Sequence, residues 1–126
     1  MFNLHLHGEY ELFYFLSGSA KHYVEGAIYP LKPNDIMLLK IAESHALLID
    51  KSIPYERIVI NFNADALIGN LKRKIISFLE DRPLGQQNRY SFSKQSKNSF
   101  FAHLDKICTT DDFDEKKLYL TFVFLM

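Results

Sequence analysis

The stretch from His5 to Gly18 constrains the fold of this chain more than any other. It begins with His5 and His7, places Glu11 four residues after the second histidine, continues as an aromatic and aliphatic run and ends at Gly18. In a β-strand, side chains two residues apart point to the same face of the sheet. The two histidines and Glu11 therefore have the same parity, although a bend near Gly8 would turn Glu11 either towards the histidines or away from them.

Short β-type runs alternate with turn residues up to Phe62. Strands are predicted over residues 10–16, 20–25, 28–31, 36–41, 45–49 and 57–62. Ser17-Gly18-Ser19 and Lys32-Pro33-Asn34-Asp35 are turn signals between them. The run at 36–41 indicates a strand that is buried on both faces. Roughly six or seven short strands at this spacing predict an all-β sandwich or barrel.

Helical spacing replaces the β-type pattern after residue 63. A helix is predicted from the caps at 63–65 to about Asp81, because apolar residues recur at helical intervals and Pro83 follows. Residues 84–95 are interpreted as a loop, and further helices are predicted over 95–108 and 115–126. The final residues from Leu118 onwards are nearly all apolar. Because a chain does not usually stop inside such a helix, we expect the sequence to be part of a longer protein.

Length, charge and cysteine content narrow the classes of function. The 126 residues suffice for one domain with a real core. Lys and Arg total 15, as do Asp and Glu, so the formal net charge is zero and no basic excess indicates nucleic-acid binding. The lone Cys108 excludes a disulfide within the chain and fits a reducing compartment. With no signal peptide and no apolar run of about 20 residues, a cytoplasmic protein without membrane contact is expected.

The histidine motif and several later segments carry a resemblance to a known family. The spacing of His5, His7, Glu11 and Gly18 is similar to the first motif of the cupin superfamily, H-x-H-(x)3-E-(x)6-G. Together, the segments at 11–18, 29–35, 43–45 and 55–62 resemble the N-terminal sensor domain of AraC-type transcription regulators. The chain departs from the second cupin motif, G-(x)5-P-x-G-(x)2-H-(x)3-N. Only its histidine, His45, survives, while the other motif positions hold Asn34, Lys40, Ala42 and Ile49.

The resemblance implies a mainly β fold, namely a cupin-like barrel (double-stranded β-helix or jelly roll) followed by two or three α-helices. It implies one sensor domain, with the barrel over residues 1–63 and a helical dimerisation segment over 64–126 that stops before a helix-turn-helix DNA-binding domain. The expected function is the sensing of a small molecule, such as a sugar, and homodimerisation in an AraC-type transcription regulator. DNA would be contacted only through the missing C-terminal domain.

Two interpretations of the histidine motif stay open. In one, His5, His7, Glu11 and His45 converge inside the barrel on a divalent metal such as Fe, Mn, Ni or Zn. In the other, the histidines lie on a half-buried strand edge and Glu11 bonds to the backbone or to an arginine. Sensor domains of this type commonly bind organic effectors without a metal. No cofactor is therefore expected, and the metal is kept as the alternative.

The barrel interior is the expected effector site, because a small barrel leaves room for one small ligand. The candidate lining residues are His7, Glu11, Phe13, Phe15, His22, Val24, Met37, Leu39, His45 and Leu47. Histidine offers an apolar body with a polar tip, which suits sugars and small aromatic or carboxylate effectors. Parity is open, so about half of these residues are expected to face outward. Alternatively, the side chains simply fill the interior.

An apolar stripe on the C-terminal helices is the candidate dimer interface, because AraC-type sensor domains dimerise through these helices. The stripe consists of Phe100, Leu104, Ile107, Leu118 and Phe124. Such a stripe is also typical of a core. The alternative function is a small metal-dependent cupin enzyme, a dioxygenase or isomerase. No catalytic residue is assigned, because no nucleophile motif and no Gly-rich phosphate loop occurs.

Overall fold

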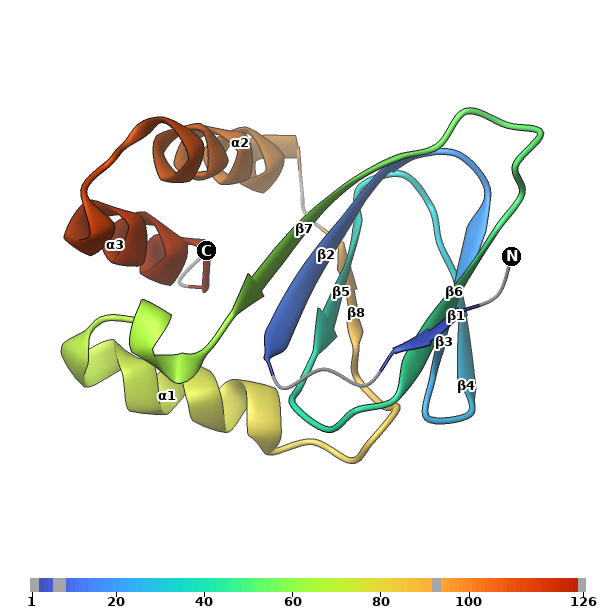
Figure 1. Cartoon of the computed structure of the whole chain (residues 1–126), viewed down its shortest axis with the longest axis horizontal. Coiled ribbons are helices and arrows are strands. Elements are labelled where there is room, and N and C mark those ends of the chain that lie inside the picture. The colour runs from blue at the N-terminus through green and yellow to red at the C-terminus, as the bar shows by residue number, and fades with distance from the viewer. Residues whose placement is uncertain (1–2, 6–8, 92–93, 125–126) are drawn as a thin grey trace. The chain divides into compact units, whose positions relative to one another are not determined.

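The computed structural model describes residues 3–5, 9–91 and 94–124, and of residues 3–5 and 94 only the backbone (Figure 1). It is mostly β in its first part and helical in its second. The elements are β1 (Asn3–His5), β2 (Tyr10–Ser17), β3 (Ala20–Val24), β4 (Ala27–Pro30), β5 (Asp35–Leu39), β6 (His45–Ile49), β7 (Glu56–Phe62), η1 (Ala64–Ala66), α1 (Gly69–Glu80), β8 (Arg89–Ser91), α2 (Lys94–Thr109) and α3 (Phe113–Phe124).

The strands form two four-stranded antiparallel sheets, with the orders β1-β6-β3-β4 and β7-β2-β5-β8. The predicted strands are confirmed to within a residue or two at their ends. The strand predicted to be buried on both faces is β5, all five residues of which are buried. This arrangement confirms a mainly β fold with C-terminal helices and is consistent with a cupin-like domain. Closure of the two sheets into a barrel stays a prediction.

The prediction of a loop over residues 84–95 is wrong for part of that segment. Residues 89–91 form β8, which pairs with β5 from Asp35↔Ser91 to Met37↔Arg89. The sequence Arg-Tyr-Ser has no apolar alternation, so local pattern does not reveal the strand. A side-chain hydrogen bond reinforces the pairing: the Ser91 hydroxyl donates to Asp35 Oδ1 over 2.7 Å.

The inner faces of the two sheets share one hydrophobic core. The cluster consists of the buried residues Phe13, Phe15, Ala20, Val24, Leu31, Met37 and Leu39, with Tyr29, Leu47, Ile49, Tyr55 and Val59 packed against it. Its members on one strand are two or four residues apart, as the alternation of side chains across a pleated strand requires. Because strands of both sheets contribute, this cluster holds the sheets face to face.

Contacts divide the chain into two compact units, residues 1–61 with 81–91 and residues 62–80 with 92–126. In the second unit, the predicted helices are confirmed as α1, α2 and α3. The backbone N–H of Ile68 donates to Thr121 Oγ1 of α3 over 3.0 Å, and the rings of Phe62 and Phe124 lie 5.3 Å apart. None of the described helices is both long enough and apolar enough to cross a bilayer.

A buried ion pair anchors residues 82–88 to the strands of the first unit. Arg82 Nη1 lies 2.8 Å from Glu43 Oε2 and Nη2 lies 2.9 Å from Oε1, and both side chains are at most 2% exposed. The carboxylate also accepts from the backbone N–H of Gly85, the backbone N–H of Lys40 and the Asn88 amide. Both oxygens of the buried Glu43 carboxylate therefore accept hydrogen bonds, as burial of charge demands.

Gly85, which contributes to this network, occupies a position that only glycine fits. Its φ of +75° lies in the left-handed region, and an added Cβ would lie 2.7 Å from the Val24 carbonyl oxygen. Gly26 has a similar φ of +83°, but its Cβ would meet nothing within 4 Å. An alanine at Gly26 would therefore meet backbone strain alone, whereas an alanine at Gly85 would meet both strain and a steric clash.

We expect Gly85→Ala to lower the free energy of unfolding by more than Gly26→Ala does. Left-handed strain alone costs on the order of 1 kcal/mol for alanine. The clash with backbone at Gly85 should raise the loss to roughly 3 kcal/mol, because the main chain of Val24 cannot move aside as a flexible side chain can. Urea unfolding followed by circular dichroism measures both. Equal losses for the two variants would contradict the crowding at Gly85.

Candidate functional site

Three buried polar side chains meet at the inner surface of the sheets. They are Glu11 of β2, His22 of β3 and His45 of β6, and one nitrogen or oxygen atom of each lies within 4.8 Å of those of the others. Glu11 Oε2 is 3.8 Å from His45 Nε2, and the two imidazole rings are 5.5 Å apart, edge to face. A carboxylate and two imidazoles so close together can bind a metal, or donate and accept hydrogen bonds to a polar ligand.

Strand register explains why these residues meet. In the β3–β6 ladder, His22 lies opposite Leu47 and Val24 lies opposite His45. The two histidines are therefore diagonal neighbours on one face of the sheet, a spacing that brings large side chains into contact. Glu11, opposite Leu39 in the β2–β5 ladder, approaches them from the facing sheet.

A pocket of about 330 Å³ opens beside this cluster. It is lined by Glu11, Phe13, His22, His45, Leu47, Arg57, Val59 and Asn61. Its volume lies at the low end of the range for small-molecule sites in proteins. Its lining is mixed, as in a site for a small polar ligand. It combines three apolar side chains with two imidazoles, a carboxylate, a guanidinium and an amide.

A tyrosine next to the pocket stays uncharged. Burial raises the pKa of Tyr55 to about 12, the positive charge of Arg57 opposes the rise, and the negative charge of Glu11 adds to it. The Arg57 guanidinium carbon lies 5.9 Å from the centre of the Tyr55 ring, within the range of a cation–π contact. Among the described residues, the buried Tyr55 hydroxyl has no hydrogen-bond partner. It is therefore a neutral donor, and its ring faces the Arg57 guanidinium.

The predicted effector-site residues fall into two groups. Glu11, Phe13, His22, His45 and Leu47 line the pocket, whereas Phe15, Val24, Met37 and Leu39 belong to the hydrophobic core. The expectation that about half would face outward is wrong, because all nine lie on the inner faces. The tenth, His7, lies outside the described residues. The interior is therefore a pocket in one part and is filled by side chains in the other.

The structure brings together two of the four predicted metal ligands, Glu11 and His45. The backbone of His5 pairs in register with His45. The side chain of His5 and the whole of His7 lie outside the described part of the chain. The structure adds His22, which the sequence indicated only as an effector residue.

The contribution of β7 to the pocket was not predicted from the sequence. Arg57, Val59 and Asn61 line the pocket, and they stand two residues apart in a run that was predicted as a strand. Their alternation was available as a signal, because side chains two apart share a face. Nothing local showed which of the two faces points inward.

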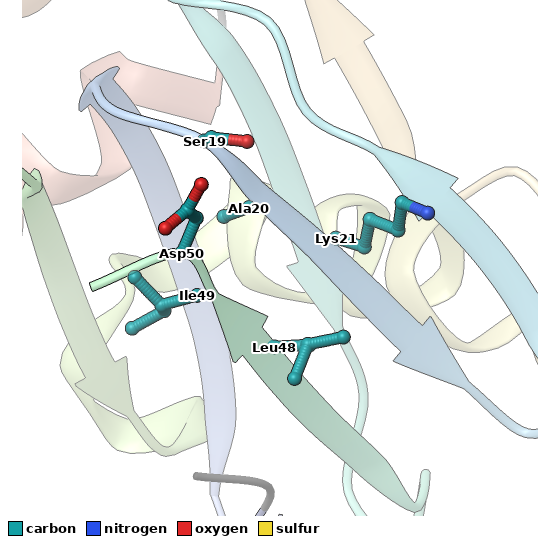
Figure 2. A pocket seen from close by; sticks show the side chains of 6 residues that line it. All are labelled: Ser19, Ala20, Lys21, Leu48, Ile49 and Asp50. Carbon is teal, nitrogen blue, oxygen red and sulfur yellow. The ribbon is translucent and has the colours of Figure 1, made fainter. Parts of the chain in front are cut away.

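A second hollow of about 270 Å³ lies along the ends of β3 and β6. It is lined by Ser19, Ala20, Lys21, Leu48, Ile49 and Asp50 (Figure 2). Its only carboxylate is already engaged, because Asp50 Oδ1 accepts from the hydroxyl and the backbone N–H of Ser52. These bonds hold the pKa of Asp50 below its ordinary value. Ring nitrogens are absent from this hollow, so it is the weaker candidate for a polar ligand.

The predicted dimer stripe is only partly exposed in the single chain. Phe100 and Leu104 of α2 are buried, while Leu118 of α3 is exposed. Two further apolar side chains of α3, Phe113 and Phe122, are exposed as well. The exposed large apolar side chains described for α2 and α3 therefore all lie on α3.

Comparison with known proteins identifies one family that matches this chain. The family described as AraC-like ligand binding domain matches residues 1–106, which include every residue that lines the pocket. No curated protein matches the chain.

Proposed function

The chain belongs to the family of AraC-like ligand binding domains, and we propose that it senses a sugar or a small hydroxylated acid for a transcription regulator. The observation that carries the proposal is the pocket of about 330 Å³ beside Glu11, His22 and His45. The family accounts for ligand binding, and the pocket lies within the matched residues.

The lining of the pocket favours this class of ligand. Glu11, His22 and Asn61 can donate to or accept from several hydroxyl groups at once, whereas Phe13 and Val59 offer apolar surface for a carbon skeleton. Arg57 adds a fixed positive charge, which would pair with a carboxylate of the ligand. A purely apolar ligand would make no hydrogen bond to Glu11 or to the two histidines that line the pocket.

Strand β7 is the element through which we expect ligand binding to affect the rest of the regulator. It supplies Arg57, Val59 and Asn61 to the pocket and ends at Phe62, which packs against Phe124 of α3. A ligand that binds one arrangement of β7 better than another shifts the equilibrium between them by its differential affinity. The zero formal charge of the chain supports an action on DNA through a separate DNA-binding domain of the full-length regulator.

A thermal-shift screen of sugars and hydroxy acids tests the proposed function. At a free ligand concentration of 100 times Kd, a ligand that binds only the folded state adds about 2.7 kcal/mol of stability. For a chain of this size, the melting temperature should then rise by roughly 10 °C. A compound of this class that stabilises the chain, and more strongly than an apolar compound of equal size, supports the proposal. If apolar compounds alone stabilise it, the proposed ligand class is wrong.

We further propose that α3 takes part in a homodimer interface. Leu118 is 37% exposed and lies on the same helix as the exposed Phe113 and Phe122. Burying an unpaired charge in an interface is costly, so Leu118→Glu should weaken association at least tenfold. Ile28→Glu on β4 is the matched control, because Ile28 is also exposed. Sedimentation equilibrium should show a dimer for the wild type and the control. A dimer unaffected by Leu118→Glu would place the interface elsewhere.

A metal-dependent cupin enzyme remains the alternative function, and family membership does not favour it. The matched family is a regulatory ligand-binding domain. Binding without turnover is therefore the proposed activity of the pocket.

A further inference from the structure

The geometry points to a divalent transition-metal site formed by Glu11, His22 and His45, with Zn²⁺ as the ion of reference. This inference deepens the proposed function, because the metal would occupy the same pocket and present open coordination positions to the effector. It differs from the ligand set that the cupin motif implies, since His22 takes part and belongs to neither cupin motif.

The donor atoms are of the right kind and nearly at the right spacing. Imidazole nitrogen and carboxylate oxygen bind Zn²⁺ at about 2.0–2.2 Å, so two donors of a tetrahedral site lie about 3.3–3.5 Å apart. Glu11 Oε2 and His45 Nε2 are 3.8 Å apart, and the three donor atoms lie within 4.8 Å of one another. A contraction of at most about 1.5 Å between donor atoms would therefore complete the site.

His45 is oriented as a metal ligand by a second contact. Its Nδ1 lies 3.3 Å from the backbone carbonyl oxygen of Glu43, while its Nε2 faces Glu11. A proton on Nδ1 donated to that carbonyl leaves Nε2 as the basic nitrogen, which is how metal-binding histidines are commonly held. The carbonyl belongs to the residue whose side chain is fixed by Arg82, so the support of His45 is itself anchored.

Because the three side chains are buried, a bound metal would add more to the stability of the fold than it would at an exposed site. Glu11 is 7%, His22 1% and His45 5% exposed. A carboxylate charge that is removed from water needs a compensating charge nearby, and a divalent cation supplies one at coordination distance. The competing arrangement is a Glu11–His45 ion pair without metal, which requires a protonated His45. Metal and proton would therefore compete for the same nitrogen.

Three protein ligands leave room for the effector. Zn²⁺ sites with two histidines and one glutamate keep at least one open coordination position. Here that position would face the pocket that Arg57 and Asn61 also line. A hydroxy acid could bind the metal through its hydroxyl and carboxylate oxygens while Arg57 pairs with the remaining negative charge.

The test is calorimetric titration of the untagged, chelator-treated chain with Zn²⁺ at pH 7.5, with Mg²⁺ as the hard-cation control. We expect about one Zn²⁺ per chain and no heat from Mg²⁺. Glu11→Gln, His22→Gln and His45→Gln should each weaken Zn²⁺ binding at least 100-fold. The matched control is His103→Gln, since His103 lies on α2 and contacts the rings of Tyr119 and Phe122 instead. Its affinity should equal that of the wild type.

A double variant, His5→Gln with His7→Gln, decides between the two ligand sets. If it retains the wild-type affinity, the Glu11–His22–His45 site is supported. If it loses as much affinity as His22→Gln does, or if His22→Gln binds normally, the proposed ligand set is overturned. Absence of Zn²⁺ binding by the wild type also overturns it.

A second readout guards against loss of fold. Far-ultraviolet circular dichroism of each zinc-free variant should match the wild type, and Zn²⁺ at 100 times Kd should raise the melting temperature of the wild type by roughly 10 °C. A variant that is folded but not stabilised by Zn²⁺ supports its residue as a ligand. The effector screen is carried out without metal and is a separate experiment. A failure of the metal site therefore does not decide whether the proposed sensing function is correct.

Discussion

Replacing Glu43 by glutamine is expected to lower the free energy of unfolding by about 3–5 kcal/mol, the loss typical when one partner of a buried ion pair is removed. The cause is the cation left behind. Arg82 is only 2% exposed on its side chain, and its two donors to Glu43 span 2.8 and 2.9 Å. Since small domains are stable by only about 5–15 kcal/mol, this single change would remove a large share of the total.

The same pair predicts how stability depends on pH. Burial alone would raise the pKa of Glu43, but hydrogen bonds from Arg82, Gly85 and Lys40 and the charge of Arg82 together hold it below its ordinary value of 4.5. A carboxyl whose pKa is lower in the folded state stabilises the fold fully above its unfolded pKa. This contribution is lost as pH falls from about 4.5 through the folded pKa. The gap in stability between wild type and Glu43→Gln should therefore shrink in that range.

The control for this prediction is an ion pair of the same type on the surface. Lys72 Nζ lies 3.1 Å from Asp65 Oδ1, but the two side chains are 39% and 86% exposed. Exposed pairs contribute at most about 1 kcal/mol, so Lys72→Ala should cost little. Urea unfolding at pH 7 and at pH 4 measures all three chains. A loss below about 1 kcal/mol for Glu43→Gln would show that the buried pair does not anchor residues 82–88.

Replacing Leu47 by tryptophan is expected to abolish ligand binding, with an affinity at least 100-fold lower than that of the wild type. Leu47 lines the pocket, and the larger ring would occupy much of its volume of about 330 Å³. Because the ring enters existing space, overpacking should cost no more than roughly 1–3 kcal/mol of stability. Isothermal titration with the strongest compound from the thermal-shift screen gives the change in affinity.

The neighbouring residue provides the matched control. Leu48 is on the same strand but on the other face of the sheet, where it is 38% exposed. Leu48→Trp should therefore bind the ligand as the wild type does. Loss of binding in Leu48→Trp but not in Leu47→Trp would move the ligand site to the hollow that Leu48 lines together with Lys21 and Asp50.

Local sequence patterns predicted most of the fold. Turn residues separated the strands correctly from Tyr10 to Phe62, because proline, glycine and asparagine at turns act through their own backbone preferences. Helical spacing likewise located α1, α2 and α3. Strand β8 was missed, since Arg89–Ser91 is short and polar and owes its pairing to β5, more than fifty residues earlier in the chain.

The candidate site was predicted less completely, because it depends on strand pairing. Glu11 and His45 were indicated by the spacing of the first motif and by the surviving histidine of the second. His22 joins them only through the register of β3 with β6, which no local pattern reveals. The Glu43–Arg82 pair spans 39 residues of sequence and was missed for the same reason.

Inward-facing positions were better predicted than expected. Every described residue of the proposed effector set lies on an inner face, because apolar and imidazole side chains at alternate positions of Phe13–Phe15 and His22–Val24 have the same parity. What the sequence did not reveal is how the interior is divided. Apolar side chains such as Phe15 and Met37 fill one part of it, and the polar cluster borders the open part.

Ligand mapping by NMR tests the central claim most directly, namely that the pocket beside Glu11, His22 and His45 binds the effector. The ¹⁵N-labelled chain would be titrated with the strongest compound from the screen while backbone amide shifts are recorded. We predict that the largest changes fall on Glu11, His22, His45 and Asn61. Changes confined to the hollow at Ser19 and Asp50, or to the helices, would contradict the proposed site.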